Sequence, residues 1–376
     1  MFRQDRTNPS SAVSNWKGRR DTAKAWSSTA VSSWLNGGLF SAGFTACPDY
    51  TAGASNRAGY CYGGVNYLGE AGQDSASMRC HRLAYSDETQ ACFAITQPGQ
   101  VTAGGFANSG TAGYAALGYA DGASVSTVVK CAFATDAVST LASGQSTARR
   151  NTLGAVALSG TAGYQAGGYG TSPTYSDVID KWSFSDDSRS TLSATLPRAK
   201  YGTAGCANSI SNGYGYFWGG YGTGYGSPTN QGFFQEITFL AFNGESTGTL
   251  SATIPLYSNL GTYQMSGMQN KNSAVYACGG YIGPLGVTAQ TRIMKVTTST
   301  ATFSTLTPTL SVGRRDAGGH SNDGTAGYAS SGVGSTDAGW RTTDKLTFSG
   351  DTVSTLASEL TYGTQYSAGF ANTSGL

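Results

Sequence analysis

Histidine is scarce in this chain of 376 residues, which contains only His81 and His320. A metal site built from several histidines is therefore excluded, and neither histidine has a His or Cys partner at metal-ligand spacing. We expect structural roles for both. The sequence also lacks a G-x-S-x-G elbow, a P-loop and an H-E-x-x-H motif. We therefore expect no catalytic activity, no cofactor and no metal.

Long apolar stretches are also missing. No apolar run reaches the roughly 18 residues of a membrane span, and the N-terminus has no apolar signal core. We expect no membrane insertion and no Sec signal, so the chain is expected to fold in a cytoplasm. The seven cysteines are an odd number without a C-x-x-C pair, which argues against a disulfide scaffold or a zinc site. They are expected to be small buried apolar residues.

Charge is low, at 12% of residues, and unevenly placed. The formal net charge is +2, and six basic residues fall within residues 1–38 against Asp5 and Asp21. The remainder of the chain is therefore close to neutral. A near-neutral surface is a poor match for nucleic acid or for an anionic membrane, and neither is expected as a partner.

Glycine and tyrosine are abundant, at 54 and 22 residues, and they recur in a repeat. An apolar strand with tyrosine ends in small residues six times, and its last glycine falls at 64, 118, 168, 220, 280 and 332. The copies read RAGYCYGG (57–64), TAGYAALGY (111–119), TAGYQAGGY (161–169), GYGYFWGGY (213–221), SAVYACGGY (273–281) and TAGYASSGV (325–333). A period near 50 residues is that of a β-propeller blade. The glycine pairs are expected to permit close backbone approach and unusual dihedral angles.

Three further pieces recur in register with these glycines, which makes four strands in each unit. A small-residue strand such as GGFANS (104–109) precedes the anchor. A strand such as DVIDKWSFS (177–185) follows it, with Trp182 and Lys181 on opposite faces, and then comes a Thr/Leu strand. Between the last two strands, Asp136, Asp187 and Asp351 supply hairpin-turn chemistry.

The two ends of the array predict how the ring closes. The chain finishes with SAGFANTSG (367–375), a seventh small-residue strand, and FSAGFTAC (40–47) opens the array. Either the C-terminal strand pairs with the first blade, or one of the two strands makes another contact. We expect closure, because an open sheet edge invites aggregation. The predicted fold is all-β, a six-bladed β-propeller over residues 39–376.

Residues 1–38 lie outside the repeat. Ala23, Trp26, Ala30 and Trp34 recur at helical spacing, which allows a short amphipathic helix. This N-terminal extension is predicted to be an attachment segment. Its candidate contact residues are Trp16, Arg19, Arg20, Trp26 and Trp34.

Variable loops between the second and third strands are the candidate recognition surface. Equivalent loops of a propeller emerge on one face, and exposed aromatic side chains stack on sugar rings. The candidate glycan-binding residues are Tyr67, Tyr225, Tyr281 and Trp340. A tyrosine directly after a glycine pair, as at Tyr169, Tyr221 and Tyr281, is alternatively expected to pack between blades.

The strands that end in glycine pairs at this period resemble kelch repeats over about residues 39–376. In particular, TAGYQAGGY (161–169) followed by IDKWSFSDDSRSTLSATLPRAKYGTAG (179–205) looks like the kelch-like repeats of tail-fibre and other virion proteins of tailed bacteriophages. The resemblance implies a protein made in the host cytoplasm and located in the virion. It also implies contacts with other virion proteins through residues 1–38 and a homo-oligomer in the particle.

Three hypotheses follow for the function. The first is a phage appendage or tail fibre whose propeller recognises a host surface glycan. The second is a virion decoration or connector protein that recognises nothing. The third, less favoured, is a polysaccharide-cleaving enzyme, which would need two carboxylates brought together in three dimensions.

Overall fold

The computed structural model describes most of the chain from Arg57 onward. The described residues are 57–66, 75–76, 79–95, 104–120, 123–152, 154–170, 175–208, 213–223, 231–255, 261–271, 273–282, 288–334, 341–361 and 363–373. The attachment segment predicted for residues 1–38 lies outside them, with its boundary and its possible helix. Within the described part, no helix is long and apolar enough to cross a membrane.

The described residues form an all-β structure that contains six antiparallel sheets of four strands each. We number the sheets along the chain and give their strands from the innermost outward. They are sheet 1, β37 (Ala368–Asn372), β1 (Ala58–Tyr62), β4 (Arg79–Ala84) and β5 (Gln90–Ala94); sheet 2, β6 (Gly104–Asn108), β7 (Ala112–Ala116), β10 (Val128–Ala132) and β11 (Ala137–Thr140); sheet 3, β12 (Ala155–Leu158), β13 (Ala162–Ala166), β14 (Ile179–Ser183) and β15 (Arg189–Thr191); sheet 4, β17 (Ala204–Ala207), β18 (Tyr214–Trp218), β21 (Glu236–Ala241) and β22 (Ser246–Thr253); sheet 5, β24 (Ser266–Asn270), β25 (Ala274–Cys278), β28 (Ile293–Thr297) and β29 (Thr302–Thr305); and sheet 6, β31 (Gly318–Asn322), β32 (Ala326–Ser330), β34 (Thr343–Thr347) and β35 (Thr352–Thr355).

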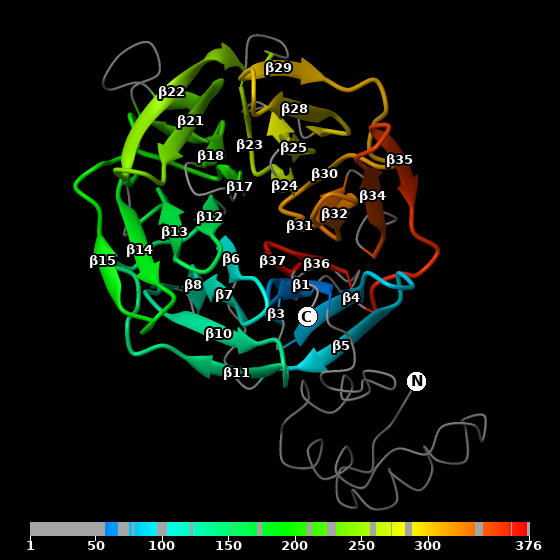
Figure 1. Ribbon diagram of the computed structural model, residues 1–376, viewed down its shortest axis with the longest axis horizontal. Coiled ribbons are helices and arrows are strands. Elements are labelled where there is room, and N and C mark those ends of the chain that lie inside the picture. The colour runs from blue at the N-terminus through cyan, green and yellow to red at the C-terminus, as the bar shows by residue number, and fades with distance from the viewer. Residues whose placement is uncertain are drawn as a thin grey trace, which may run out of the picture. The chain divides into compact units, whose positions relative to one another are not determined.

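The six sheets surround a common axis (Figure 1). Each innermost strand contacts the innermost strands of two other sheets, in the closed order β6, β12, β17, β24, β31, β37 and back to β6. This arrangement is consistent with a β-propeller-like fold. The four-strand unit expected from the sequence repeat is confirmed in each sheet.

The C-terminal strand closes the ring. Strand β37 pairs antiparallel with β1, from Ala58 opposite Asn372 to Tyr62 opposite Ala368. The first sheet is thus built from both ends of the described chain. The predicted closure through the seventh small-residue strand is confirmed, while the copy at 40–47 lies outside the described residues.

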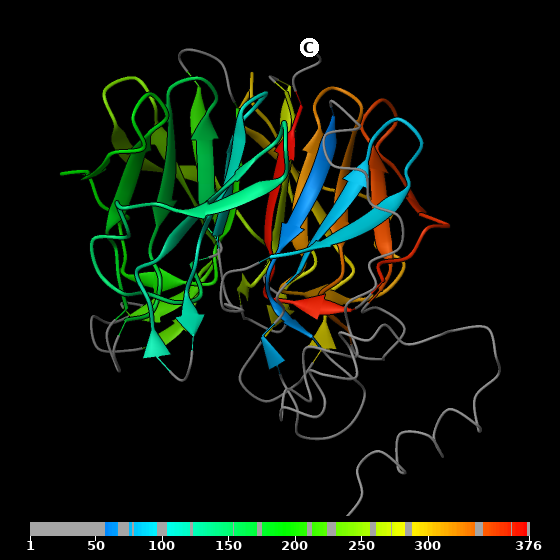
Figure 2. The same cartoon turned by 90° about the horizontal axis from the view of Figure 1, so that it is seen from below.

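Short strands extend the inner hairpins at one end of the ring, the lower end in Figure 2. They are β2 (Val65–Asn66), β3 (Ser75–Ala76), β8 (Tyr119–Ala120), β9 (Ala123–Ser124), β16 (Lys200–Tyr201), β19 (Tyr221–Thr223), β20 (Gln231–Phe233), β23 (Thr262–Tyr263), β26 (Tyr281–Ile282), β27 (Thr288–Ala289), β30 (Arg314–Arg315), β33 (Val333–Gly334) and β36 (Thr364–Gln365). A glycine pair joins a second strand to its extension: Gly167 and Gly168 have φ of 72° and 116°, a backbone region that favours glycine. The unusual dihedral angles expected of the glycine pairs are therefore present.

Neighbouring sheets pack by seating a side chain on a glycine. Phe106 of β6 lies over Gly163 of β13, where a Cβ atom would overlap the Phe106 ring. Four other pairs of sheets repeat this contact: Phe370 over Gly113, Val156 over Gly215, Met268 over Gly327 and His320 over Gly59. Interiors are close-packed, so the missing side chain is what makes room for its neighbour. The recurring Ala-Gly-Tyr triplet therefore has a packing explanation.

A second contact between sheets uses the tyrosine of the same triplet. The Tyr114 hydroxyl donates to Asp187 at 2.8 Å, and Lys130 Nζ lies 2.7 Å from the same carboxylate. Asp187 sits in the hairpin turn of the next sheet with φ of 57°. The equivalent contacts are Tyr164 and Lys181 to Glu245, Tyr276 and Lys295 to Asp351, Tyr328 and Lys345 to Glu88, and Tyr60 to Asp136. The acidic turn residues thus tie neighbouring sheets together.

Sheets 4 and 5 meet differently. Phe239 stands where the other third strands carry a lysine or arginine, and Ala301 stands at the acidic turn position, with φ of 51°. At the same interface Val275 replaces the glycine, and the small Cys206 replaces the larger seated side chain. Both partners have therefore changed in each of the two contacts. The lysine–acid contact has become apolar, and in the packing contact the large and small residues have exchanged strands.

The glycine contact predicts a steric effect on stability. Replacement Gly163→Ala should lower the free energy of unfolding by about 1–3 kcal/mol, because the added methyl group meets the Phe106 ring. Gly350→Ala is the matched control, since the nearest atom to its added Cβ is Thr352 Cγ2 at 3.7 Å. Urea denaturation measures both variants. Equal losses in the two would contradict the packing account.

The altered interface predicts that the polar clamp can be rebuilt. Phe239→Lys alone should destabilise, because an aromatic ring leaves an apolar cluster and the lysine has no acid opposite it. Adding Ala301→Asp should recover about 0.5–1 kcal/mol in a double-mutant cycle measured by denaturation. A coupling energy of zero would show that the clamp is not transferable between interfaces.

Candidate functional site

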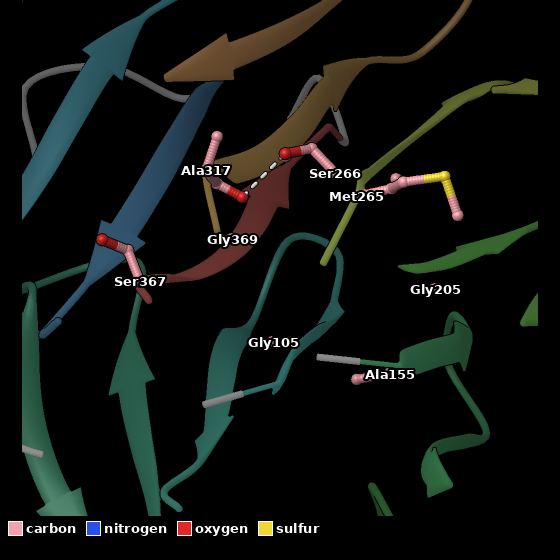
Figure 3. A pocket seen from close by; sticks show the side chains of 10 residues that line it. Gly105, Ala155, Gly205, Met265, Ser266, Ala317, Ser367 and Gly369 are labelled. Carbon is pink, nitrogen blue, oxygen red and sulfur yellow. Dashed lines mark hydrogen bonds between the residues drawn. The ribbon is translucent and has the colours of Figure 1, made fainter. Parts of the chain in front are cut away.

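The axis is narrow at its middle, where one small residue of each innermost strand meets its neighbours. These residues are Gly105, Ala155, Gly205, Gly267, Gly319 and Gly369, several of which are labelled in Figure 3. At Gly105, Gly205, Gly267, Gly319 and Gly369 a Cβ would overlap a backbone carbonyl of the adjacent strand. The cavity left here is about 30 Å³, roughly the share of one water molecule in the liquid. The axis at this level has no room for a larger ligand.

A larger cavity of about 340 Å³ opens along the axis on the side of the turns that follow the innermost strands. Among the described residues that line it, Asp323 is the one acid, and its carboxylate accepts hydrogen bonds from Gln269 Nε2 at 3.3 Å and Thr373 Oγ1 at 3.1 Å. Burial raises the pKa of Asp323 above its usual value. Glycoside cleavage ordinarily needs a pair of carboxylates, and the lining of this cavity offers one.

The opposite end of the ring carries a continuous row of half-buried aromatic and arginine side chains. We call this surface the tyrosine arc. Its members are Tyr119, Arg150, Tyr169, Tyr175, Tyr201, Tyr221, Phe233, Tyr263, Tyr281 and Arg315. All except the buried Phe233 are partly exposed. The arc spans sheets 2 to 6 and is the largest set of accessible aromatic groups in the described part of the chain.

The rings of the arc form a chain of direct contacts. Tyr201 lies between Tyr169 and Tyr221, with ring centroids 5.9 Å and 5.7 Å away. Tyr263 continues the row between Tyr221 at 6.2 Å and Tyr281 at 5.4 Å. Most of these pairs are steeply inclined, which is a favourable geometry for aromatic rings. The contacts alternate between residues of one sheet and residues of the next.

Buried ion pairs fix the backbone beneath the arc. Arg149, just before Arg150, pairs with Asp180 at 2.5 Å, and both side chains are almost fully buried. Lys200, before Tyr201, pairs with Glu236 at 2.9 Å. Arg314, before Arg315, holds Asp344 at 2.9 Å in the same way. In each case the first side chain points inward and forms an ion pair, and the next residue along the chain points outward as a member of the arc.

Three hydroxyl groups of the arc are held neutral by burial. Burial raises the pKa of Tyr175, Tyr201 and Tyr263 above the usual tyrosine value. These groups therefore remain hydrogen-bond donors throughout the physiological pH range. Together the rings supply apolar faces with polar edges, which is the combination that binds a sugar ring or another flat amphipathic group.

Asp316 is an unusual carboxyl group close to the arc. It is buried, and neither carboxylate oxygen has a hydrogen-bond partner in the described part of the chain. Arg315 Nη1 lies 3.8 Å from one of them. Burial raises the pKa of Asp316 well above its usual value, and its charge in turn raises the pKa of Tyr366.

Of the candidate glycan-binding residues, Tyr281 lies in the arc. Tyr67, Tyr225 and Trp340 lie outside the described residues, as do Trp16, Arg19, Arg20, Trp26 and Trp34 of the attachment segment. Tyr169, Tyr221 and Tyr281 pack against the side chains of neighbouring sheets, as the alternative expectation held, yet they stay partly exposed. Packing and exposure are therefore combined in the same residues.

Tyr201, Tyr263 and Arg150 were not expected from the sequence. Each occupies the same place, directly after an inward residue that precedes an innermost strand, as in Arg149-Arg150, Lys200-Tyr201 and Thr262-Tyr263. The signal was a two-residue unit at the repeat period. Because its outward member is an arginine in some units and a tyrosine in others, the position does not stand out as one repeated residue type.

The histidines and cysteines take buried positions. Both histidines have a lowered pKa because of burial, about 4 for His81 and about 3 for His320, so they are neutral near pH 7. Cys61, Cys80, Cys131, Cys206 and Cys278 are free and buried. Cys92, however, is disulfide-bonded. The expectation that every cysteine is an unpaired apolar residue is therefore wrong for Cys92.

No protein-family model matches the chain, and no curated protein matches it. The function is therefore inferred from the geometry of the described residues and from the sequence repeat.

The environment of Asp316 predicts a pH-dependent difference in stability. The pKa of Asp316 is higher in the folded than in the unfolded protein. The contribution of this group to stability is therefore complete below about pH 4 and is lost as the pH rises through the folded pKa. Asp316→Asn does not titrate, so its stability relative to the unchanged protein should increase with pH. Urea denaturation at about pH 5 and about pH 8 measures the difference, at about 1.4 kcal/mol per unit of pKa shift. A constant difference would contradict the burial argument.

Proposed function

We propose that the six sheets are the blades of a six-bladed kelch-like β-propeller, and that the protein is a bacteriophage virion component that recognises a host surface glycan. The tyrosine arc is the recognition surface. Residues 1–38 attach the propeller to other virion proteins, and the propeller acts as a binding module without catalytic activity. The single observation that carries recognition is the row of partly exposed aromatic side chains at one end of the ring of sheets.

The arrangement of the arc supports a glycan as the ligand. Sugar rings present flat C–H faces that pack on aromatic rings and hydroxyl groups that need hydrogen-bond partners. Tyr175 and Tyr201 are stacked at 5.8 Å with an angle of 7° between their planes, and both hydroxyl groups stay protonated. Mounting on β-structure with buried ion pairs keeps these side chains ordered before binding. Less conformational entropy is then lost in the complex.

The kelch-like repeat supports the virion assignment. The resemblance is to the repeats of tail-fibre and other virion proteins, in which a β-rich array follows an N-terminal attachment segment. If the protein is made in the host cytoplasm and assembled into the virion in several copies, many arcs lie side by side. Weak single sites would then act together through multivalency.

One observation favours the alternative, a decoration or connector protein that recognises nothing. Tyr214 is 40% exposed, and among the described residues it is the one exposed large apolar side chain. Its ring lies 5.5 Å from Phe239, at the apolar interface between sheets 4 and 5. Exposed aromatic groups of this kind are common at contacts between subunits. This patch, unlike the arc, is small.

Replacing arc residues tests the proposal. Tyr175→Ala and Tyr263→Ala should each weaken binding to the surface polysaccharide of a host cell by roughly fivefold to tenfold, since each removes about 1 kcal/mol of stacking. Tyr214→Ala is the matched control, because it removes an exposed tyrosine outside the arc. Binding is measured by surface plasmon resonance on purified polysaccharide.

Two outcomes would overturn the proposal. One is equal binding by all three variants. The other is the absence of binding to any host envelope glycan by the unchanged protein, which would favour the decoration or connector alternative. The roles of Tyr67, Tyr225 and Trp340 stay predictions, and alanine substitutions in the same assay extend the test to them.

A further inference from the structure

Arg150 occupies a distinctive place at one end of the tyrosine arc. Its guanidinium carbon lies 4.9 Å from the ring centroid of Tyr119 and 5.0 Å from that of Tyr169. The backbones of Arg150 and Tyr169 exchange two hydrogen bonds of 2.8 Å. The guanidinium group is therefore held between two tyrosines that belong to neighbouring sheets, and it remains partly exposed.

The charge of Arg150 is not balanced by a carboxylate within the described part of the chain. Its neighbour Arg149 pairs with Asp180, and Arg315 at the other end of the arc lies near Asp316. For Arg150 no ion pair is present among the described residues, and its buried Nε has no hydrogen-bond partner there. The described residues therefore order a cation on the surface and supply no acid for it.

This environment suits the capture of an anion. Contact with aromatic rings occupies the faces of a planar guanidinium group and leaves the N–H groups at its edge able to donate hydrogen bonds. A carboxylate, sulfate or phosphate accepts two parallel hydrogen bonds from such an edge. Because the rings and the paired backbone already restrict the side chain, little additional ordering is needed when the anion binds.

We infer that Arg150 is an anion-binding subsite of the arc and that the recognised glycan is acidic. The inference rests on the proposed function. The sugar rings pack on the tyrosines, and a carboxylate or a sulfate or phosphate ester of the glycan meets Arg150. Arg315, stacked on Tyr281 at 4.9 Å, is the second cation of the arc, but its hydrogen bond to Gln264 and its proximity to Asp316 make it the weaker anion partner.

A pair of ligands that differ only in charge tests the inference. Oligogalacturonate carries one carboxylate per sugar, and its methyl ester has the same rings without the charge. The unchanged protein should bind the acid at least tenfold more tightly than the ester in isothermal titration calorimetry, and added salt should reduce the difference. Dextran sulfate in a parallel titration distinguishes a sulfated from a carboxylated ligand.

Three variants assign the effect to Arg150. Arg150→Gln should lose about tenfold or more in affinity for the favoured acidic ligand, and Arg150→Lys should be intermediate because it keeps the charge and loses the planar fork. Arg341→Gln is the matched control: it removes the same charge at an exposed arginine whose side chain is 53% accessible. Circular dichroism of the three variants checks that each of them is folded.

The outcomes separate this inference from the proposed function. Equal affinity for acid and ester, or equal losses in Arg150→Gln and Arg341→Gln, would overturn the anion subsite. If neutral polysaccharide binds and Tyr263→Ala abolishes that binding while Arg150→Gln does not, recognition by the arc stands and the acidic ligand is wrong. If no acidic ligand and no host polysaccharide binds, both proposals fail.

Discussion

The contact on which the rest of the structure depends is a side chain of one innermost strand seated on a glycine of the next sheet. At Phe106 over Gly163, and at its equivalents, this contact brings the sheets close enough for their innermost strands to meet around the axis. It recurs at five of the six interfaces. At the sixth interface the small residue, Cys206, stands at the position of the seated side chain, and the larger Val275 stands at the position of the glycine. All six interfaces thus combine one larger and one smaller residue, although the residue types differ.

The tyrosine arc is a consequence of that spacing. Tyr201 and Tyr263 are carried by segments that lead into innermost strands, whereas Tyr169, Tyr221 and Tyr281 follow second strands of neighbouring units. Their rings touch because adjacent sheets are packed closely. The ion pairs beneath them, such as Arg149 with Asp180, are buried and keep this backbone in place. The two ends of the ring therefore differ in character: one has a cavity lined by both polar and apolar residues, and the other has an aromatic row.

The sequence predicted the strands and their order because each strand repeats a local pattern at a period near 50 residues. Closure was predictable because a seventh small-residue strand had no partner within its own unit. The contacts between sheets were not predictable, because Phe106 and Gly163 belong to different repeat units and meet only in the folded protein. The arc was found only in part: Tyr281 stands out after a glycine pair, while Arg150 and Tyr201 differ in residue type and align only by position.

Recognition by the arc is the central claim of this account, and hydrogen–deuterium exchange with a bound host polysaccharide fragment tests it most directly. We predict slower exchange in the segments that contain Tyr169, Tyr201 and Tyr263, with little change at the opposite end of the axis. Slower exchange confined to the opposite turns, around Ser109 and Ser159, would contradict the claim and assign binding to the axial cavity.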